Sequence, residues 1–133
     1  MILKIVGTTL TGTLRSSFSK RYPYLKLEFF RQGTNFNQTG SRKDLITEDV
    51  EINSIRESRS EGYLEFDQQI TVEELESAFL NQFGLHVQVF RQSGKVWLET
   101  VTTDHLSLEQ QNEMGKEHSI TFKEESNFDF DYD

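Results

Sequence analysis

The pattern of apolar and polar residues changes from a strand period to a helix period near the middle of the chain. Residues 62–66 alternate at period two, which predicts a strand with Leu64 and Phe66 facing inward. Apolar residues at helical spacing then follow on a single face: Val72, Leu75, Phe79, Leu80 and Phe83. A stripe of this spacing is typical of an amphipathic helix that packs on a core.

Both ends of this helix are marked in the sequence. Thr71 is placed to cap the first turn, and Glu74 can reach back to the backbone of Thr71, as in a capping box. Gly84 supplies the left-handed conformation that commonly ends a helix. We therefore predict a helix over residues 72–83.

A hairpin and a second helix are predicted after it. Residues 86–90 and 95–99 alternate like strands on either side of the turn dipeptide Ser93-Gly94. Ser107 is placed to cap a short helix, which we expect to end near Gly115.

The first half of the chain has the same order of elements with weaker signals. Residues 2–6 and 25–31 have strand patterns, and between them lies the apolar face of a helix: Leu10, Leu14, Phe18 and Tyr22. Residues 33–43 predict a long polar turn. Residues 47–55 fit either a helix capped by Thr47 or an alternating strand, and the charged residues 56–61 predict a joint between the halves.

The two halves match in three blocks at nearly constant spacing. The helix face Leu14, Phe18 and Tyr22 recurs at one constant offset as Leu75, Phe79 and Phe83. At an offset shorter by one position, residues 27–32 recur as 87–92, and Asp44, Ile46 and Thr47 recur as Asp104, Leu106 and Ser107. The matching apolar, turn and cap positions indicate an internal duplication, and the alternative is coincidence between two ordinary helix–strand segments.

These elements predict one α+β domain over residues 1–133. It is built of two pseudo-repeated β-α-β-β-α units, at about 1–57 and 62–117, that pack about a pseudo-twofold axis. A helical crossover joins parallel strands and a hairpin joins antiparallel ones, so we expect a mixed sheet with helices packed on one face. We also expect residues 119–122 to add a closing strand and residues 123–133 to form an acidic aromatic tail.

Composition narrows the class of protein. The chain has eleven Phe but one Pro and one Ala, the strongest helix former, which disfavours a helical bundle. The absence of Cys excludes disulfides, thiolate zinc sites and Cys nucleophiles. The N-terminal apolar run is too short for a signal peptide, and no stretch approaches the ~20 apolar residues of a membrane span. We therefore expect a cytoplasmic protein without membrane association.

Charge is distributed unevenly and suggests a protein partner. The net charge of −8 divides into +4 for residues 1–60 and −12 for residues 61–133. This asymmetry favours docking of one half on the other, within a chain or between chains, and so predicts self-association as a dimer; charges that are merely solvated are the alternative. Basic and aromatic residues mix around Phe18 and Tyr22, but the pI near 4.9 and the lack of a binding signature disfavour nucleic acid.

Six residues are candidates for an interaction surface: Arg31, Arg91, Trp97, Phe128, Phe130 and Tyr132. Arg31 and Arg91 end equivalent predicted strands and mark either an anion site or, as we favour, a structural position. Trp97 lies in an alternating strand and suits a core or an interface.

The last three candidates belong to the alternating acidic and aromatic tail. This tail suits an edge strand, a solubilising extension or docking into a basic groove. Over six residues it is similar to the acidic tails of bacterial single-stranded-DNA-binding proteins, although no oligonucleotide-binding barrel accompanies it.

Signals of catalysis or metal binding are absent from the sequence. His86, His105 and His118 are scattered, without the spacing of metal ligands, and no nucleophile elbow, phosphate loop or dinucleotide fingerprint occurs. We predict no catalytic residues and no cofactor or metal.

Four runs carry a resemblance to known sequences: residues 23–30, 84–91, 95–100 and 108–112. With them the chain resembles a group of small uncharacterised bacterial proteins over most of its length, a resemblance that implies no activity and no functional residues. The sequence therefore favours a non-enzymatic protein-interaction or binding module. The alternative is a small-molecule-binding or enzymatic domain with its site between the two repeats.

Overall fold

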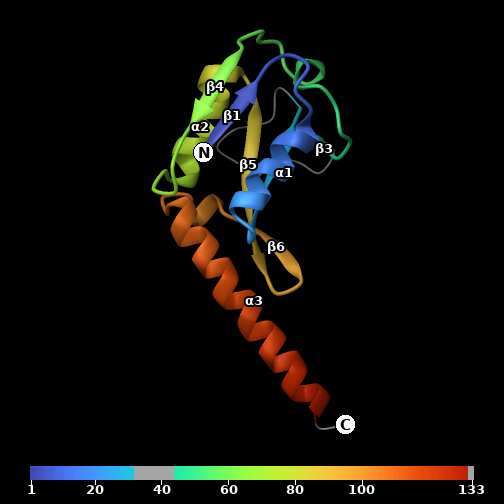
Figure 1. Ribbon diagram of the computed structural model, residues 1–133, viewed down its shortest axis with the longest axis vertical. Coiled ribbons are helices and arrows are strands. Elements are labelled where there is room, and N and C mark those ends of the chain that lie inside the picture. The colour runs from blue at the N-terminus through green and yellow to red at the C-terminus, as the bar shows by residue number, and fades with distance from the viewer. Residues whose placement is uncertain (32–43, 132–133) are drawn as a thin grey trace.

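The computed structural model describes residues 1–31 and 44–131, with side chains up to residue 120. The fold is α+β (Figure 1). Its strands and helices in chain order are β1 (Ile2–Ile5), α1 (Thr11–Arg21), β2 (Leu25–Phe30), β3 (Leu45–Ile46), β4 (Gly62–Glu65), α2 (Val72–Phe83), β5 (His86–Ser93), β6 (Val96–Glu99) and α3 (Leu108–Asp131). The polar turn expected at residues 33–43 lies outside the described residues.

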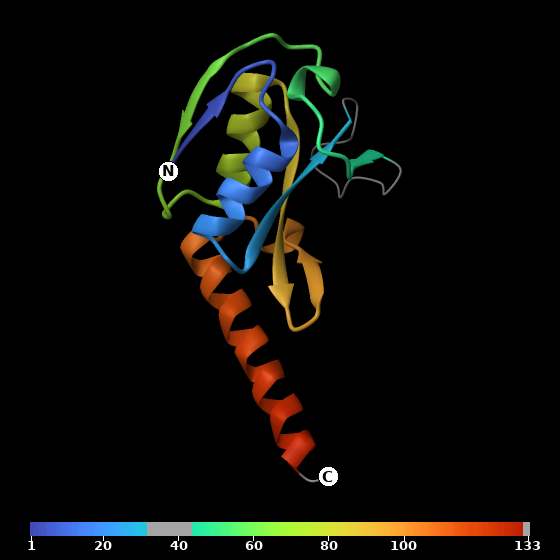
Figure 2. The same cartoon turned by 45° about the vertical axis from the view of Figure 1, so that its right-hand side comes forward.

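The described strands form two sheets with helices between them. One sheet pairs β1 with β4, and the other has the order β3-β2-β5-β6. In Figure 2 the small sheet lies on one side of α1 and α2 and the larger sheet on the other. The apolar faces of both sheets and of the two helices contribute to one core, in which the rings of Phe29 on β2 and Phe79 on α2 pack edge to face at 6.4 Å. Leu64 and Phe66 are buried as predicted.

The prediction of a mixed sheet is wrong, because every described strand pair is antiparallel. The helices α1 and α2 stand between the sheets, so the strands that each helix connects belong to different sheets. The strands before the two helices pair with each other, β1 with β4, and so do the strands after them, β2 with β5.

The registers of β1 with β4 and of β2 with β5 are compatible with the predicted pseudo-twofold axis. Leu3 pairs with Leu64, and Glu28 pairs with Gln88. These two pairs are separated by the same offsets that relate the matched blocks of the sequence. In an antiparallel pair related by a twofold axis, equivalent residues face each other at the axis. The duplication itself stays a prediction.

The third matched block differs from the alignment made on sequence. The backbone N–H of Thr11 donates to the Val50 carbonyl, as that of Val72 donates to the Leu106 carbonyl. Val50, rather than Ile46, therefore takes the position of Leu106 at the start of the helix. The helix considered for residues 47–55 is reduced to a short 3₁₀ turn at Ile52–Ser54.

The helix predicted over residues 72–83 is confirmed. The Thr71 hydroxyl accepts from the Glu74 N–H at 3.1 Å, and the Glu74 carboxylate accepts from the Thr71 N–H at 3.1 Å. Gly84 ends the helix with a φ of 66°.

Loss of this cap should weaken the fold measurably. Thr71→Ala removes the hydroxyl acceptor, and we expect the free energy of unfolding in urea to fall by about 1 kcal/mol. Thr71→Ser keeps the hydroxyl and is the control, which should stay within about 0.5 kcal/mol of the original chain. Equal losses in the two variants would contradict a role for the hydroxyl.

The second predicted helix begins as expected but does not end at Gly115. Ser107 and Gln110 form a second capping box, with bonds of 2.9 and 3.1 Å. The helix α3 then continues to Asp131, so no closing strand forms at residues 119–122. Gly115 allows α3 to lie close to Tyr24, because a Cβ atom at position 115 would stand 2.8 Å from the Cβ of Tyr24.

Candidate functional site

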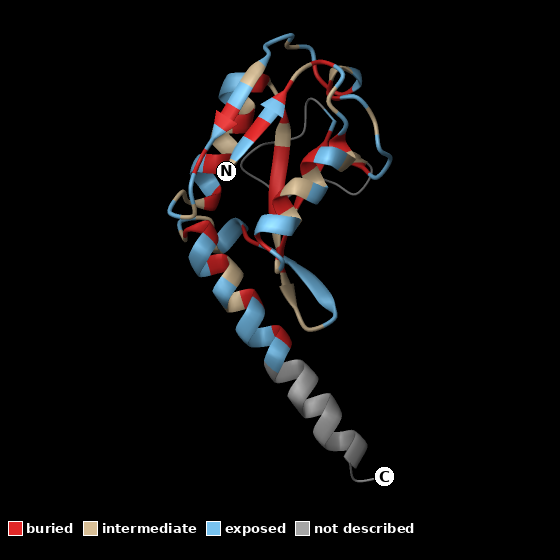
Figure 3. Cartoon of the chain, viewed as in Figure 1, coloured by how far each residue is buried: buried red, intermediate tan, exposed pale blue. Residues whose placement is uncertain are grey.

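Strand β6 is the most exposed part of the larger sheet. All four of its residues are exposed, and it pairs with β5 as an edge strand (Figure 3). Trp97 is 38% exposed, and the Lys26 ammonium lies 4.8 Å from its ring and 5.6 Å from that of Phe90. The edge therefore combines an exposed apolar surface with a cation–π contact that fixes the indole.

The two candidate arginines are not brought together. Arg31 is exposed just after the end of β2, where its N–H donates to the Asp44 carbonyl. Arg91 is buried opposite Leu25, at the other end of β2, and donates to the Gln111 side chain at 2.8 Å. Arg91 thus contributes to the contact between β5 and α3.

The three aromatic candidates of the tail are not placed in a described surface. Phe128 and Phe130 fall within the bounds of α3, beyond the described side chains, and Tyr132 lies outside the described residues. The helical backbone through Asp131 corrects the expectation of an edge strand or an unstructured tail up to that residue.

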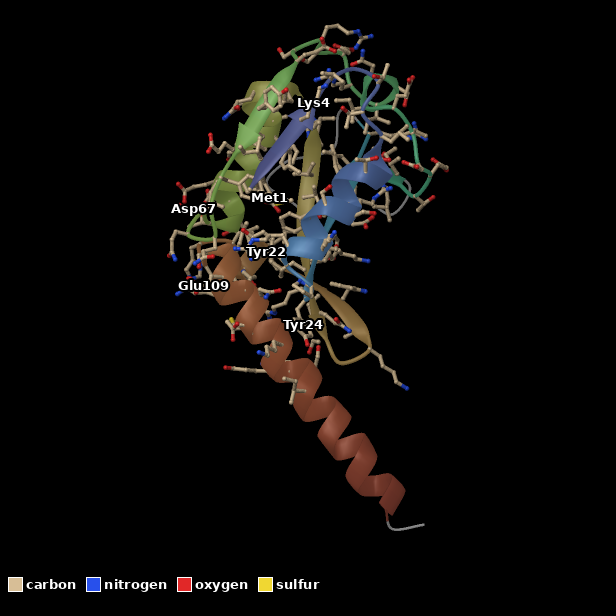
Figure 4. All side chains as sticks on the ribbon, in the orientation of Figure 1. Met1, Lys4, Tyr22, Tyr24, Asp67 and Glu109 are labelled. Carbon is tan, nitrogen blue, oxygen red and sulfur yellow. The ribbon has the colours of Figure 1, made fainter. Side chains whose placement is uncertain are left out.

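A small polar pocket lies where the two halves of the chain meet. It has a volume of about 150 Å³ and is lined by Arg21, Tyr22, Gln68, Glu109, Asn112 and Glu113. Figure 4 shows Tyr22, Asp67 and Glu109 close together, at the end of α1, after β4 and at the start of α3. Arg21 donates to the Gln68 side chain at 3.0 Å, and its guanidinium lies 5.0 Å from the Tyr22 ring.

Two partly buried titratable groups were missed by the sequence analysis. Burial raises the pKa of Glu76 on α2 to about 7, with Asp104 and Glu73 adding to the increase, although the carboxylate accepts a bond from the Val89 N–H at 3.0 Å. A signal was present, because Glu76 falls beside the apolar stripe of its helix. Burial also lowers the pKa of His86, whose Nδ1 has no hydrogen-bond partner among the described residues.

The described part of the chain was also compared with the requirements of a metal site and of a membrane-spanning helix. It contains no group of three or more His, Cys, Asp or Glu side chains placed to hold a metal ion. Within residues 1–31 and 44–131, none of the helices is both long and apolar enough to cross a membrane.

Comparisons with known proteins return no match to this chain, whether made against protein-family models, curated proteins or solved structures.

Proposed function

We propose that the chain is a non-enzymatic protein-interaction module and that a second copy of the chain docks on strand β6. The observation that carries this proposal is the exposure of three apolar residues in a four-residue edge strand: Val96 at 56%, and Trp97 and Leu98 at 38% each. An edge strand also presents backbone donors and acceptors that another strand can pair with.

The sequence around β6 is complementary to itself when two copies run antiparallel. Lys95 and Glu99 stand two positions before and after Trp97. A register with Trp97 opposite Trp97 sets Val96 of each copy opposite Leu98 of the other and brings Lys95, in the turn before β6, towards Glu99 of the other copy. Opposite charges and aromatic pairs across strands each stabilise a sheet by about 0.2–1 kcal/mol. This register would extend the larger sheet into the second copy.

A single short strand makes a small interface. Contacts at the low end of the size range belong to weak complexes, so we expect a dimer that dissociates at micromolar rather than nanomolar concentration. The net charge of −8 on each copy opposes association further.

Sedimentation equilibrium across a concentration series tests the dimer, with fluorescence of the single tryptophan as a local reporter. We expect mass to rise with concentration and Trp97 emission to shift to shorter wavelength as the strands pair. Val96→Lys should give a monomer, because it adds a positive charge beside Lys95 and removes an apolar contact.

Ile2→Lys is the matched control. Ile2 is 60% exposed and lies in the small sheet, so its replacement should leave association unchanged. A strict monomer with constant Trp97 emission at all concentrations would overturn the proposal, as would equal association by the Val96→Lys variant.

A further inference from the structure

We infer that Glu76, Thr100 and Val89 form a proton-sensitive latch, which holds the end of β6 while Glu76 keeps its proton and releases it when the proton is lost. The latch itself stands on contacts within one chain. Its consequence, weaker docking of a second copy at high pH, rests on the proposed function, because β6 is the docking strand.

Two side chains complete the sheet edge where β6 stops. Strand β5 begins at His86, but among the described residues its pairing with β6 covers Phe90–Ser93. At Val89 the N–H donates to the Glu76 carboxylate at 3.0 Å, and the carbonyl accepts from the Thr100 hydroxyl at 2.7 Å. Thr100 directly follows β6 and is 2% exposed. The two side chains therefore take the place of a strand partner and fix the end of β6.

The connection from β6 to α3 brings a second carboxylate to this place. It passes the first turn of α2, where the Asp104 carbonyl accepts from the Glu73 N–H at 2.9 Å (Figure 1). Glu76 thus faces Val89 on β5, Asp104 in the connection and Glu73 on its own helix. Burial and then the charges of Asp104 and Glu73 raise the pKa of Glu76 to about 7, against the opposing effect of the Val89 bond. Loss of the proton leaves three carboxylates of like charge at the end of β6.

The connection is the element that can yield to this repulsion. Glu73 and Glu76 are fixed on a helix, whereas none of the residues in the 3₁₀ turn Val101–Thr103 is buried. Moving the connection away separates Asp104 from Glu76 and lets water reach the charged carboxylate. The same movement pulls Thr100 from β5, so β6 loses its anchor. Docking on a loosened strand costs additional ordering entropy, which weakens it.

Amide exchange followed by NMR tests the latch in the full chain without reference to the dimer. The Glu73 amide reports on the connection, because it donates to the Asp104 carbonyl. After correction for the intrinsic pH dependence of exchange, its protection should fall at least about tenfold between pH 6 and pH 8. The Tyr22 amide, which donates to the Phe18 carbonyl at the end of α1, should lose much less.

Glu76→Gln should keep the latch closed. The amide is neutral at both pH values and can still accept from the Val89 N–H, so protection of the Glu73 amide should not change with pH. Glu117→Gln, at an exposed position of α3, is the matched control and should behave as the original chain does.

Sedimentation at pH 6 and pH 8 then measures the effect on docking. The dissociation constant of the dimer should rise about fivefold or more in the original chain and clearly less in Glu76→Gln. The histidines His86, His105 and His118 lose charge over the same range in both proteins, so the comparison isolates Glu76.

Each result decides a separate part of the inference. Constant protection of the Glu73 amide in the original chain, or an equal fall in Glu76→Gln, would overturn the latch. A dimer with the same pH dependence in both proteins would overturn the coupling to docking. A monomer at both pH values would overturn the proposed function and with it the coupling, while amide protection would still decide the latch.

Discussion

Replacing Glu76 by Gln should remove a pH dependence of stability of about 3 kcal/mol. Burial raises the pKa of this carboxyl from 4.5 to about 7 in the folded protein. Each unit of difference from the unfolded chain corresponds to about 1.4 kcal/mol, which gives the expected size as an upper estimate. The original chain should therefore be less stable at pH 8 than at pH 5.

The sign follows from where the proton is held. Between pH 4.5 and about 7 the folded protein keeps a proton on Glu76 that the unfolded chain has lost. Raising the pH through this window therefore favours unfolding, and above it the loss is complete. Among the described residues, the pairing of β6 with β5 covers Phe90–Ser93 and ends before Val89, whose N–H donates to Glu76 instead.

Urea unfolding at pH 5, 6, 7 and 8 measures this dependence. The amide oxygen that Glu76→Gln introduces can still accept from the Val89 N–H, so this variant should be more stable than the original chain at pH 8 and similar at pH 5. Glu117→Gln, at an exposed position of α3 and not one of the groups that raise the pKa of Glu76, should keep the original pH dependence. A flat profile for the original chain would contradict the burial argument.

Structural features that depend on neighbouring residues in the sequence could be predicted, whereas features that depend on packing between distant segments could not. The helix 72–83 was predicted to the residue because Thr71, Glu74 and Gly84 act through bonds within a few positions. Gly115 is the same residue type as Gly84, but its role depends on the backbone and side chains of distant segments. The side of a strand that faces the core follows from the alternation of its apolar and polar residues. The strand with which it pairs depends on the positions of the helices.

The same division applies to the candidate sites. Trp97 could be found as an aromatic residue in a strand pattern, but its exposure follows from the position of β6 at the sheet edge. The polar pocket could not be found, because Arg21, Gln68 and Glu109 are far apart in the sequence and form no motif. Only the expectation of a site between the halves indicated its place.

Arg56→Ala should destabilise the fold by about 3 kcal/mol, because it leaves the buried Phe83 carbonyl and two partly buried acceptors without a donor. The segment 56–61 was predicted to be a joint between the halves, yet Arg56 is only 5% exposed. Its guanidinium donates to the Asn53 side chain at 2.9 Å and to the carbonyls of Ser60 and Phe83 at 2.8 Å each. It therefore fastens the connection to the C-terminal end of α2, where a positive charge also complements the helix dipole.

Arg59→Ala is the control that separates this role from a general effect of charge. Arg59 is exposed and, within the described residues, donates to the nearby carbonyls of Arg56, Glu57 and Ser58, so its loss should cost less than about 0.5 kcal/mol. Arg56→Lys keeps the charge but cannot reach three acceptors with one ammonium, so it should recover only part of the stability. If urea unfolding gave equal losses for Arg56→Ala and Arg59→Ala, the segment would be the simple joint that its composition suggests.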